Sequence, residues 1–233
     1  MSENIKKIKK TFVVDLNSSE NQSIILKPSA RPFNNQAHQI NEVAKKIYEL
    51  IKDTKHPNDD IILNHNKIKK AFFSPFKPQL KSAQVFLSHS HADKNKALKV
   101  KDYLEEDLDA ECVFIDSLFW DYKDDVLNEL SEYDKTSKIK DAFTLILRES
   151  LQNMIEKCPY FVFLESKNSV SNQGLSRTTY SAWIYEELKI AHSIRESRPT
   201  PMMESWQVSH DISPFLKSLE TITLIKLSHI INS

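Results

Sequence analysis

Short apolar runs alternate with amphipathic segments over the last two thirds of the 233-residue chain, and this alternation limits the fold more than any other feature. Three of the runs, at residues 84–88, 112–115 and 160–164, contain consecutive apolar positions, as strands do when both faces of a sheet are covered. A fourth candidate strand lies at residues 221–227, and helices are expected at residues 94–107, 124–133, 137–157 and 181–193. The pattern predicts an α/β fold with a mostly parallel, five-stranded sheet flanked by helices, its fifth strand in the C-terminal part.

The first 80 residues have a different pattern. They contain two short β-like runs, at residues 11–16 and 23–26, and a helical stretch at residues 36–52. That stretch carries one apolar stripe, formed by Ile40, Val43, Ala44, Ile47 and Ile51. A polar, proline-punctuated zone follows and suggests a boundary near residue 80. We therefore expect a partly helical N-terminal extension, residues 1–80, whose stripe packs on a main domain at residues 81–233.

Two residue counts exclude several classes of protein. Gly174 is the one glycine in the chain, which excludes both the GxGxxG dinucleotide fingerprint and the glycine-rich phosphate loop of P-loop ATPases. The two cysteines, Cys112 and Cys158, each lie beside an apolar run and form no CxxC pair. They are therefore expected to be buried thiols and not part of a zinc or redox motif.

The charge is balanced overall, with 32 basic and 32 acidic residues, but it is divided unevenly along the chain. Residues 1–80 carry a balance of +6 and residues 81–233 a balance of −6. Docking of the basic part on the acidic part, or a solvated face, explains this better than nucleic-acid binding. The chain has no apolar run long enough for a membrane span and no secretory signal at its start, so we expect a cytoplasmic protein.

The expected topology directs attention to three loops, because ligands of open α/β sheets bind beyond the carboxyl ends of the strands. These loops are residues 88–93, 116–124 and 165–180. The first contains the H-x-H-x-D run His89, His91 and Asp93, which resembles the metal-binding signature of metallo-β-lactamase-fold hydrolases. Lys94 stands where that signature normally continues into another ligand, and no other histidine has a recognisable spacing. Capping of the following helix is the other interpretation of these polar residues.

A second group of residues lies on the expected helix at residues 181–193. Trp183 and Glu187 are four residues apart, so an aromatic ring and a carboxylate share one face of the helix and can meet one ligand. Glu186 points in another direction. A glutamate near a helix start often faces solvent and is favoured there by the helix dipole alone.

Residues 84 to about 195 resemble a Toll/interleukin-1 receptor (TIR) domain, in particular the bacterial type of antiphage defence systems. The run Val85-Phe86-Leu87-Ser88 with Asp93 is similar to the opening of that family, and Phe114-Ile115-Asp116 to the end of its second strand. Ser166 and Asn168, followed by Ser181, Trp183 and Glu187-Leu188, resemble the elements around its catalytic glutamate. The chain departs from the family in residues 117–123, which lack an Arg-Gly pair, and in an extra polar segment at residues 169–179.

The resemblance implies a flavodoxin-like TIR fold and cleavage of NAD+ between nicotinamide and ribose. Glu187 would take the catalytic position. The resemblance assigns substrate contacts to Ser88, His89, Ser90, Asp93, Asp116, Trp120, Ser181 and Trp183. It implies neither a metal nor a resident cofactor, since NAD+ is the substrate. Implied products are ADP-ribose, a cyclic isomer or a conjugate, and implied partners are other TIR copies, a phage-derived trigger and a separate effector.

A function of another class stays open, because many TIR domains are adaptors that only bind other TIR domains. The Trp183/Glu187 pair favours the enzyme, since an adaptor has no need for it. A metal-dependent hydrolase is the third possibility.

Overall fold

The computed structural model of this chain describes residues 10–27, 40–52, 65–72, 74, 82–106, 112–131, 137–173, 176–193 and 209–232. The chain forms two compact units. The first consists of Met1–Arg31, Ser82–Ser117 and Gln152–Ser233, and the second of Pro32–Lys81 and Leu118–Leu151. Near residue 80, where the sequence suggests a boundary, the chain passes from the second unit into the first. The first unit, however, also includes Met1–Arg31.

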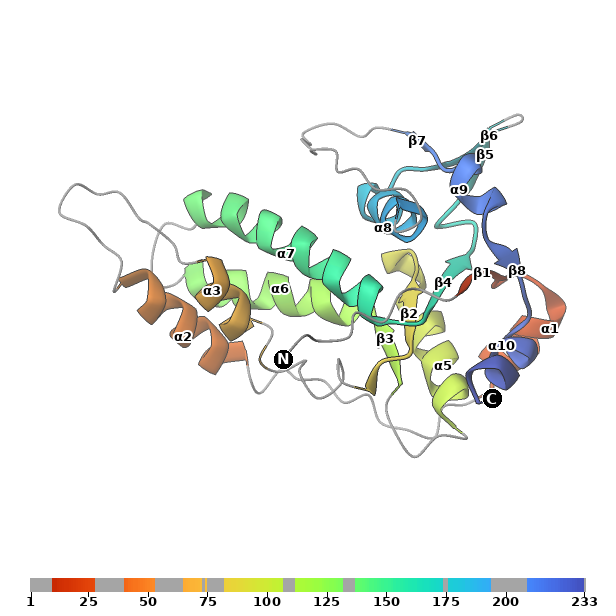
Figure 1. Cartoon of the computed structure of the whole chain (residues 1–233), viewed down its shortest axis with the longest axis horizontal. Coiled ribbons are helices and arrows are strands. Elements are labelled where there is room, and N and C mark those ends of the chain that lie inside the picture. The colour runs from red at the N-terminus through yellow and green to blue at the C-terminus, as the bar shows by residue number, and fades with distance from the viewer. Residues whose placement is uncertain are drawn as a thin grey trace. The chain divides into compact units, whose positions relative to one another are not determined.

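The first unit is built on a five-stranded sheet in the order β3-β2-β4-β1-β8, and every strand pair is parallel (Figure 1). The strands are β1 (Lys10–Asp15), β2 (Val85–Ser88), β3 (Val113–Ile115), β4 (Tyr160–Glu165) and β8 (Glu220–Thr221). This is an α/β fold with an all-parallel sheet flanked by helices, consistent with a flavodoxin-like fold, and the predicted fold class is confirmed. β1, from the first 80 residues, lies between β4 and β8.

Aromatic side chains pack in a row across the sheet. Phe86 of β2 is in register with Phe114 of β3 and with Phe161 of β4. Its ring stacks on both, at centroid distances of 5.9 Å and 5.8 Å. Cross-strand pairs of this kind stabilise a sheet beyond the area they bury. The consecutive apolar residues of these strands are buried because both faces of the sheet are covered.

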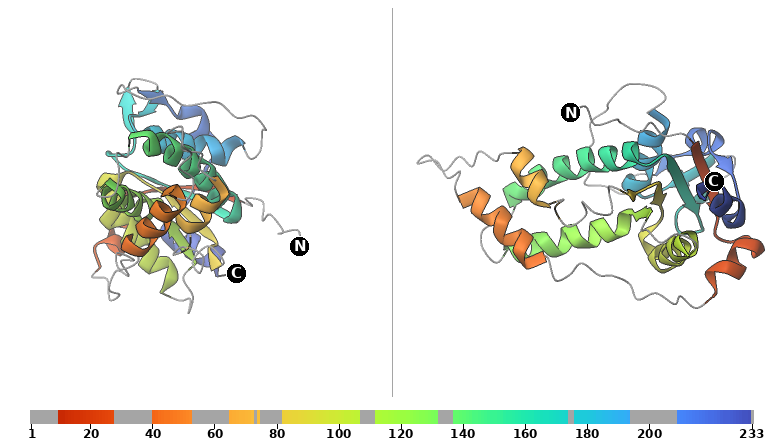
Figure 2. Two further views of the ribbon diagram at one scale, coloured as in Figure 1. Left: turned by 90° about the vertical axis from the view of Figure 1, so that its left-hand side faces the viewer. Right: turned by 60° about the horizontal axis from the view of Figure 1, so that its bottom comes forward.

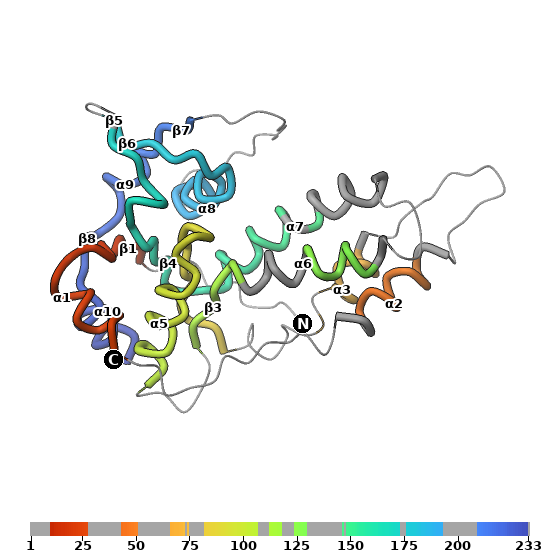
Figure 3. Tube along the Cα trace, turned by 180° about the vertical axis from the view of Figure 1, so that it is seen from behind, coloured from red at the N-terminus to blue at the C-terminus, as the bar shows by residue number. Residues whose placement is uncertain are grey.

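Helices α1 (Ser19–Ile25), α5 (Lys94–Glu105) and α10 (Leu224–Ile231) lie together beside the sheet. Helix α8 (Ala182–Ser193) lies at the end where β2 and β4 terminate (Figures 1 and 3). The buried Asn21 connects α1 to both β1 and α10. Its amide donates to the Asp15 carbonyl at 2.8 Å and accepts from the Leu224 backbone N–H at 3.0 Å.

A carboxylate fixes the start of β3 against the end of α5. Glu105 Oε1 accepts hydrogen bonds from the backbone N–H groups of Cys112 and Val113, each at 2.8 Å. Lys101, one turn earlier on α5, donates to both oxygens of Glu105 and to the Val113 carbonyl. The short edge strand is therefore held by side chains as well as by β2.

A smaller antiparallel sheet, in the order β5-β6-β7, forms a further layer of the first unit. Its strands are β5 (Ser171–Gln173), β6 (Ser176–Thr179) and β7 (His210–Asp211), and α9 (Ser213–Lys217) follows it. Arg177 of β6 forms an ion pair with Glu165 at the end of β4. The extra polar segment at residues 169–179 is therefore mainly a hairpin of this sheet.

The second unit is helical. It contains α2 (Ile40–Lys52), α3 (His65–Phe72) and most of α6 (Asp116–Ser131) and α7 (Ser137–Lys157), which Figure 2 shows from two further sides. The middle of the predicted stripe is buried at Val43, Ala44 and Ile47. The side chains of Ile40 and Ile51 lie outside the described part of the structure. Lys69 of α3 forms an ion pair with Glu149 of α7 at 2.9 Å.

Three sequence predictions are wrong. Residues 221–227, expected as a strand, are strand only at Thr221 and then turn into α10. Residues 23–26 end a helix and do not form a strand. The expected loop at residues 116–124 is the first part of α6. Among the described residues, no helix is both long and apolar enough to cross a membrane.

Candidate active site

The candidate site lies at the carboxyl ends of β2 and β3. β3 lies on one side of β2 and β4 on the other, so the strand order reverses at β2. In open α/β sheets this switch point is where ligands bind. β2 ends at Ser88, with His89 directly after it, and β3 is followed by Asp116 and Ser117. All four of these polar side chains are buried.

His89 and Asp116 form a buried pair. His89 Nδ1 and Asp116 Oδ1 are 2.8 Å apart. The distance is that of an ion pair, although the contact lacks the angles of a directed hydrogen bond. Burial lowers the pKa of His89, but the charge and contact of Asp116, the Leu87 carbonyl and the charge of Asp93 outweigh it, so that the pKa is raised.

Glu187 of α8 completes the cluster and is fully buried. Desolvation raises the pKa of its carboxyl well above the ordinary value, and the charge and contact of Asp116 raise it further, while a contact with Ser88 acts in the opposite direction. No described residue gives either oxygen of Glu187 a well-directed hydrogen bond. Burial and the neighbouring Asp116 therefore both favour the protonated form of the Glu187 carboxyl in this conformation.

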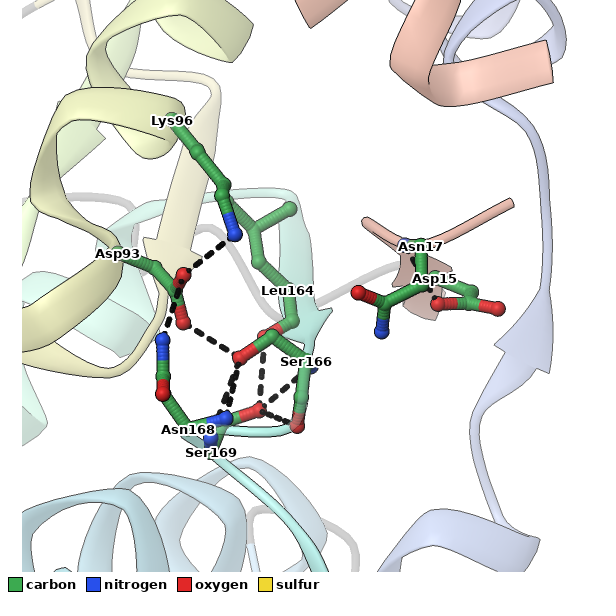
Figure 4. Close-up of polar contacts among 8 residues, drawn as sticks. All are labelled: Asp15, Asn17, Asp93, Lys96, Leu164, Ser166, Asn168 and Ser169. Atoms are coloured by element: carbon green, nitrogen blue, oxygen red, sulfur yellow. Dashed lines mark hydrogen bonds and ion pairs between the residues drawn. The ribbon is translucent and has the colours of Figure 1, made fainter. Parts of the chain in front are cut away.

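Asp93 lies in a neighbouring polar cluster, shown in Figure 4. Its Oδ1 accepts from Lys96 Nζ at 2.9 Å and from Asn168 Nδ2 at 3.0 Å, and its Oδ2 accepts from the Ser166 hydroxyl. Burial acts to raise the pKa of Asp93, but the hydrogen bonds from Ser166, Lys96 and Asn168 and the charge of Lys96 lower it. The side chain of Asp93 does not cap α5, so the capping interpretation is wrong at this residue. The cluster connects the start of α5 to the end of β4.

The structure places the other predicted site residues less centrally. Ser181 caps α8, because its hydroxyl accepts from the Ile184 N–H at 3.2 Å. Ser90 precedes the short helix η3 (His91–Asp93) and makes no capping bond with its side chain. Trp183 is half-buried in the first turn of α8. Trp120 belongs to α6, and its side chain lies outside the described part of the structure.

Sequence reasoning missed two features of the site. Ser117 is buried beside Asp116, and its position two residues after the end of an apolar strand was the available signal. Glu186 was expected only to point away from Glu187, yet it is nearly as buried as Glu187. Its Oε2 lies 3.9 Å from Lys189 Nζ. Adjacent helical glutamates give no sequence signal that both are buried.

The H-x-H-x-D run does not converge on one point. His89 is buried against Asp116, whereas His91 is exposed. In the described ranges, no group of three or more His, Cys, Asp or Glu side chains is arranged to hold a metal ion.

The buried cluster therefore consists of two carboxyl groups, one imidazole and two hydroxyl groups. Buried titratable groups with shifted pKa values, at the point where the strand order reverses, are typical of functional sites. Such a cluster can hold or release a proton, and Glu187 can become an anion when a positive charge is placed beside it.

No family model, curated protein or solved structure matches the chain.

Proposed function

We propose that this chain is a TIR-type enzyme that cleaves NAD+ between nicotinamide and ribose. One observation carries the proposal. The four residues Ser88, His89, Asp116 and Glu187, expected from the resemblance to be site residues, come from three separate segments and lie in one buried cluster. Their place at the carboxyl ends of the strands is the one at which such a sheet binds ligands.

The chemistry of this bond requires little proton transfer. Nicotinamide leaves as a neutral pyridine, and the ribose becomes oxocarbenium-like in the transition state. A carboxylate close to the sugar stabilises that positive charge. Glu187 would supply the carboxylate, and Trp183, one turn earlier on the same face of α8, would stack on a base of the dinucleotide or wall the pocket.

The proposed reaction requires a change at the site, because Glu187 is fully buried and its surroundings raise its pKa and so favour its protonated form in this conformation. The site must open for NAD+ to reach this carboxyl, and Glu187 must lose its proton. TIR-domain enzymes, which this chain resembles, commonly become active when copies associate. We therefore propose that copies of this chain associate in the cytoplasm in response to a phage-derived trigger, and that this association opens the site. The product would be ADP-ribose, a cyclic isomer or a conjugate that signals to a separate effector.

The test is nicotinamide release. Concentrated protein is incubated with NAD+, with and without extract from phage-infected cells, and the products are identified by mass spectrometry. We expect free nicotinamide from the wild type and a loss of about a hundredfold or more in Glu187→Gln, because the amide keeps the shape and removes the charge.

Glu186→Gln is the matched control. Glu186 is on the same helix and is nearly as buried, but its side chain leaves the helix roughly 100° away from that of Glu187. It should keep most of the activity. Equal losses in the two variants would mean that burial or net charge, and not a positioned carboxylate, causes the effect. A normal rate in Glu187→Gln would remove the proposed mechanism.

The alternative is a TIR adaptor without enzymatic activity. The full burial of Glu187 favours it, because an adaptor needs no access to this carboxyl. If neither incubation releases nicotinamide, the adaptor becomes the better explanation. Dialysis against a chelator distinguishes the TIR enzyme from a metal-dependent hydrolase. NAD+ cleavage that depends on a carboxylate continues after the dialysis, whereas metal-dependent activity is lost.

A further inference from the structure

Three titratable side chains from three elements meet in the core of the first unit. His89 follows β2, Asp116 begins α6, and Glu187 belongs to α8. Asp116 Oδ1 is 2.8 Å from His89 Nδ1, and the charge of Asp116 acts on the fully buried Glu187 carboxyl, which accepts no well-directed hydrogen bond from the described residues. The side chains of His89 and Asp116 are 1% and 6% exposed, so bulk water does not screen this group.

The charges of the cluster do not balance if every group is ionised. Two carboxylates and one imidazolium would leave one uncompensated negative charge in the core, which is very costly. Among the described residues, the other charged groups nearby do not compensate it. Asp93, which acts on His89, is itself negative and has its own partners, and Lys189 lies near Glu186. One additional proton leaves a neutral cluster.

We infer that the cluster stores this proton on Glu187 at rest, and that Asp116, held by His89 and buried near Glu187, is a positioning residue which sets the charge of Glu187 through its own negative charge. The pKa shifts of the described groups agree in direction. Desolvation and then the charge of Asp116 raise the pKa of Glu187, and Asp116 raises the pKa of His89 against the effect of burial. Because the three groups are coupled, their protons belong to the cluster and not to one residue.

Release of the proton follows from the arrival of a positive charge. A cation beside Glu187 favours its ionised form, and the proton then passes to the solvent as Glu187 changes from a carboxylic acid to a carboxylate. This half of the inference rests on the proposed function, in which the cation is the pyridinium ring of NAD+. The storage of the proton does not depend on any substrate.

Storage is tested by the pH dependence of unfolding. A group whose pKa is raised in the folded state stabilises the fold fully below its unfolded pKa, and this contribution is lost as the pH rises through the folded pKa. Unfolding by urea, measured between about pH 5 and pH 8, should therefore show wild-type stability decreasing as Glu187 and His89 lose protons. Glu187→Gln should lose the larger part of this dependence, and Glu186→Gln should keep it.

The same slope in the wild type and in Glu187→Gln would overturn the inference, because Glu187 would then be ionised in the folded state. If Glu187→Gln does not fold, the infrared spectrum of the wild type at about pH 8 decides, since ordinary carboxyl groups are ionised there. A carboxylic-acid carbonyl band that is present in the wild type and persists in Glu186→Gln supports a proton stored on Glu187. A wild-type spectrum without this band overturns the inference.

The role of Asp116 is tested by the pH profile of nicotinamide release. With Asp116→Asn the charge that opposes ionisation of Glu187 is gone, so the acid limb of kcat/KM should move to lower pH. An acid limb that stays at the same pH would refute the positioning role. A lower rate with an unmoved limb would show that the substitution caused only a structural defect. If no nicotinamide is released at all, the proposed function fails, and the unfolding measurements still decide whether the proton is stored.

Discussion

Asp93 and Glu187 are two buried carboxyl groups that the same fold accommodates in opposite ways. Asp93 is 2% exposed and keeps its charge because Lys96, Ser166 and Asn168 donate to it. Glu187 is 0% exposed and is next to another carboxyl group, which favours the protonated form. Burial alone therefore does not decide the charge of a carboxyl group. The hydrogen-bond donors and the charges beside the group decide it.

We predict that Asp93→Asn destabilises the first unit by about 1–3 kcal/mol, because the donors around it lose a charged acceptor. Its lowered pKa stabilises the fold above the unfolded pKa, and this contribution is lost as the pH falls through the folded pKa. The variant should therefore lack part of the acid sensitivity of the wild type. Urea unfolding at neutral and acid pH measures both effects.

Lys96→Met is the control for this prediction. Lys96 is 44% exposed, so its ion pair with Asp93 is partly screened by water and contributes at most about 1 kcal/mol. The hydrogen bonds from Ser166 and Asn168 stay in place. A loss in Lys96→Met as large as that in Asp93→Asn would contradict the importance of these two neutral donors.

At the scale of helices and strands, the sequence predicted the long amphipathic helix and the strands with consecutive apolar residues. Helix α7 coincides with the predicted residues 137–157, and β2, β3 and β4 were found from their consecutive apolar residues. Short apolar runs were less informative, because a buried helical turn and a buried strand look alike over four to seven residues. The capping hydroxyls of Ser18 and Thr223 were the missed signals that residues 19–25 and 224–231 are helices.

The candidate site was predictable in part. Parallel strands bring their carboxyl ends to one edge, which was enough to associate Ser88, His89 and Asp116. The position of Glu187 came from the resemblance. The contacts of Asp93 with Ser166 and Asn168 were not predictable, because they depend on how the end of β4 packs against the start of α5. The raised pKa of Glu187 depends on burial, and the spacing of residues in the sequence does not reveal burial.

Helix α8 carries Glu187, so its N-terminal cap should matter for the site. We predict that Ser181→Ala lowers the stability by about 1 kcal/mol, because the Ile184 N–H loses its acceptor. Ser181→Thr keeps a hydroxyl and should lose much less. Thermal unfolding of the two variants measures the difference, and equal stability of the alanine and threonine variants would show that the cap contributes nothing.

At the scale of the whole molecule, the main departure from expectation is the origin of one strand. β1, at residues 10–15, fills the place between β4 and β8, so the sheet needs both ends of the described chain. Phe12 and Val14 of this strand are 0% exposed. Residues 10–15 are therefore part of the core and not an appendage to it.

Removal of this strand should disrupt the fold of the first unit. A protein that starts at Lys81 lacks β1, which leaves β8 without its partner and exposes one side of β4. We expect it to show no cooperative thermal unfolding by circular dichroism. A truncated protein that melts at the wild-type temperature would contradict this.

A single substitution tests the same point without a truncation. Phe12→Ala should cost about 3–5 kcal/mol, as large-to-small changes in a packed core do. Lys10→Ala, at an exposed position of the same strand, should stay within about 0.5 kcal/mol of the wild type. Similar small losses in both variants would show that β1 contributes little to the core.

The position of β1 also sets the order of events during synthesis on the ribosome. β1 is made before both of its neighbours, because Lys10 pairs with Tyr160, and Phe12 pairs with Glu220 on the other side of the strand. At about 5–20 residues per second, the first partner emerges roughly 8–30 s after β1. During that time the apolar strand Lys10–Asp15 has neither neighbour, so the sheet can close only after residues 220–221 have been made, and the nascent chain needs protection from aggregation until then.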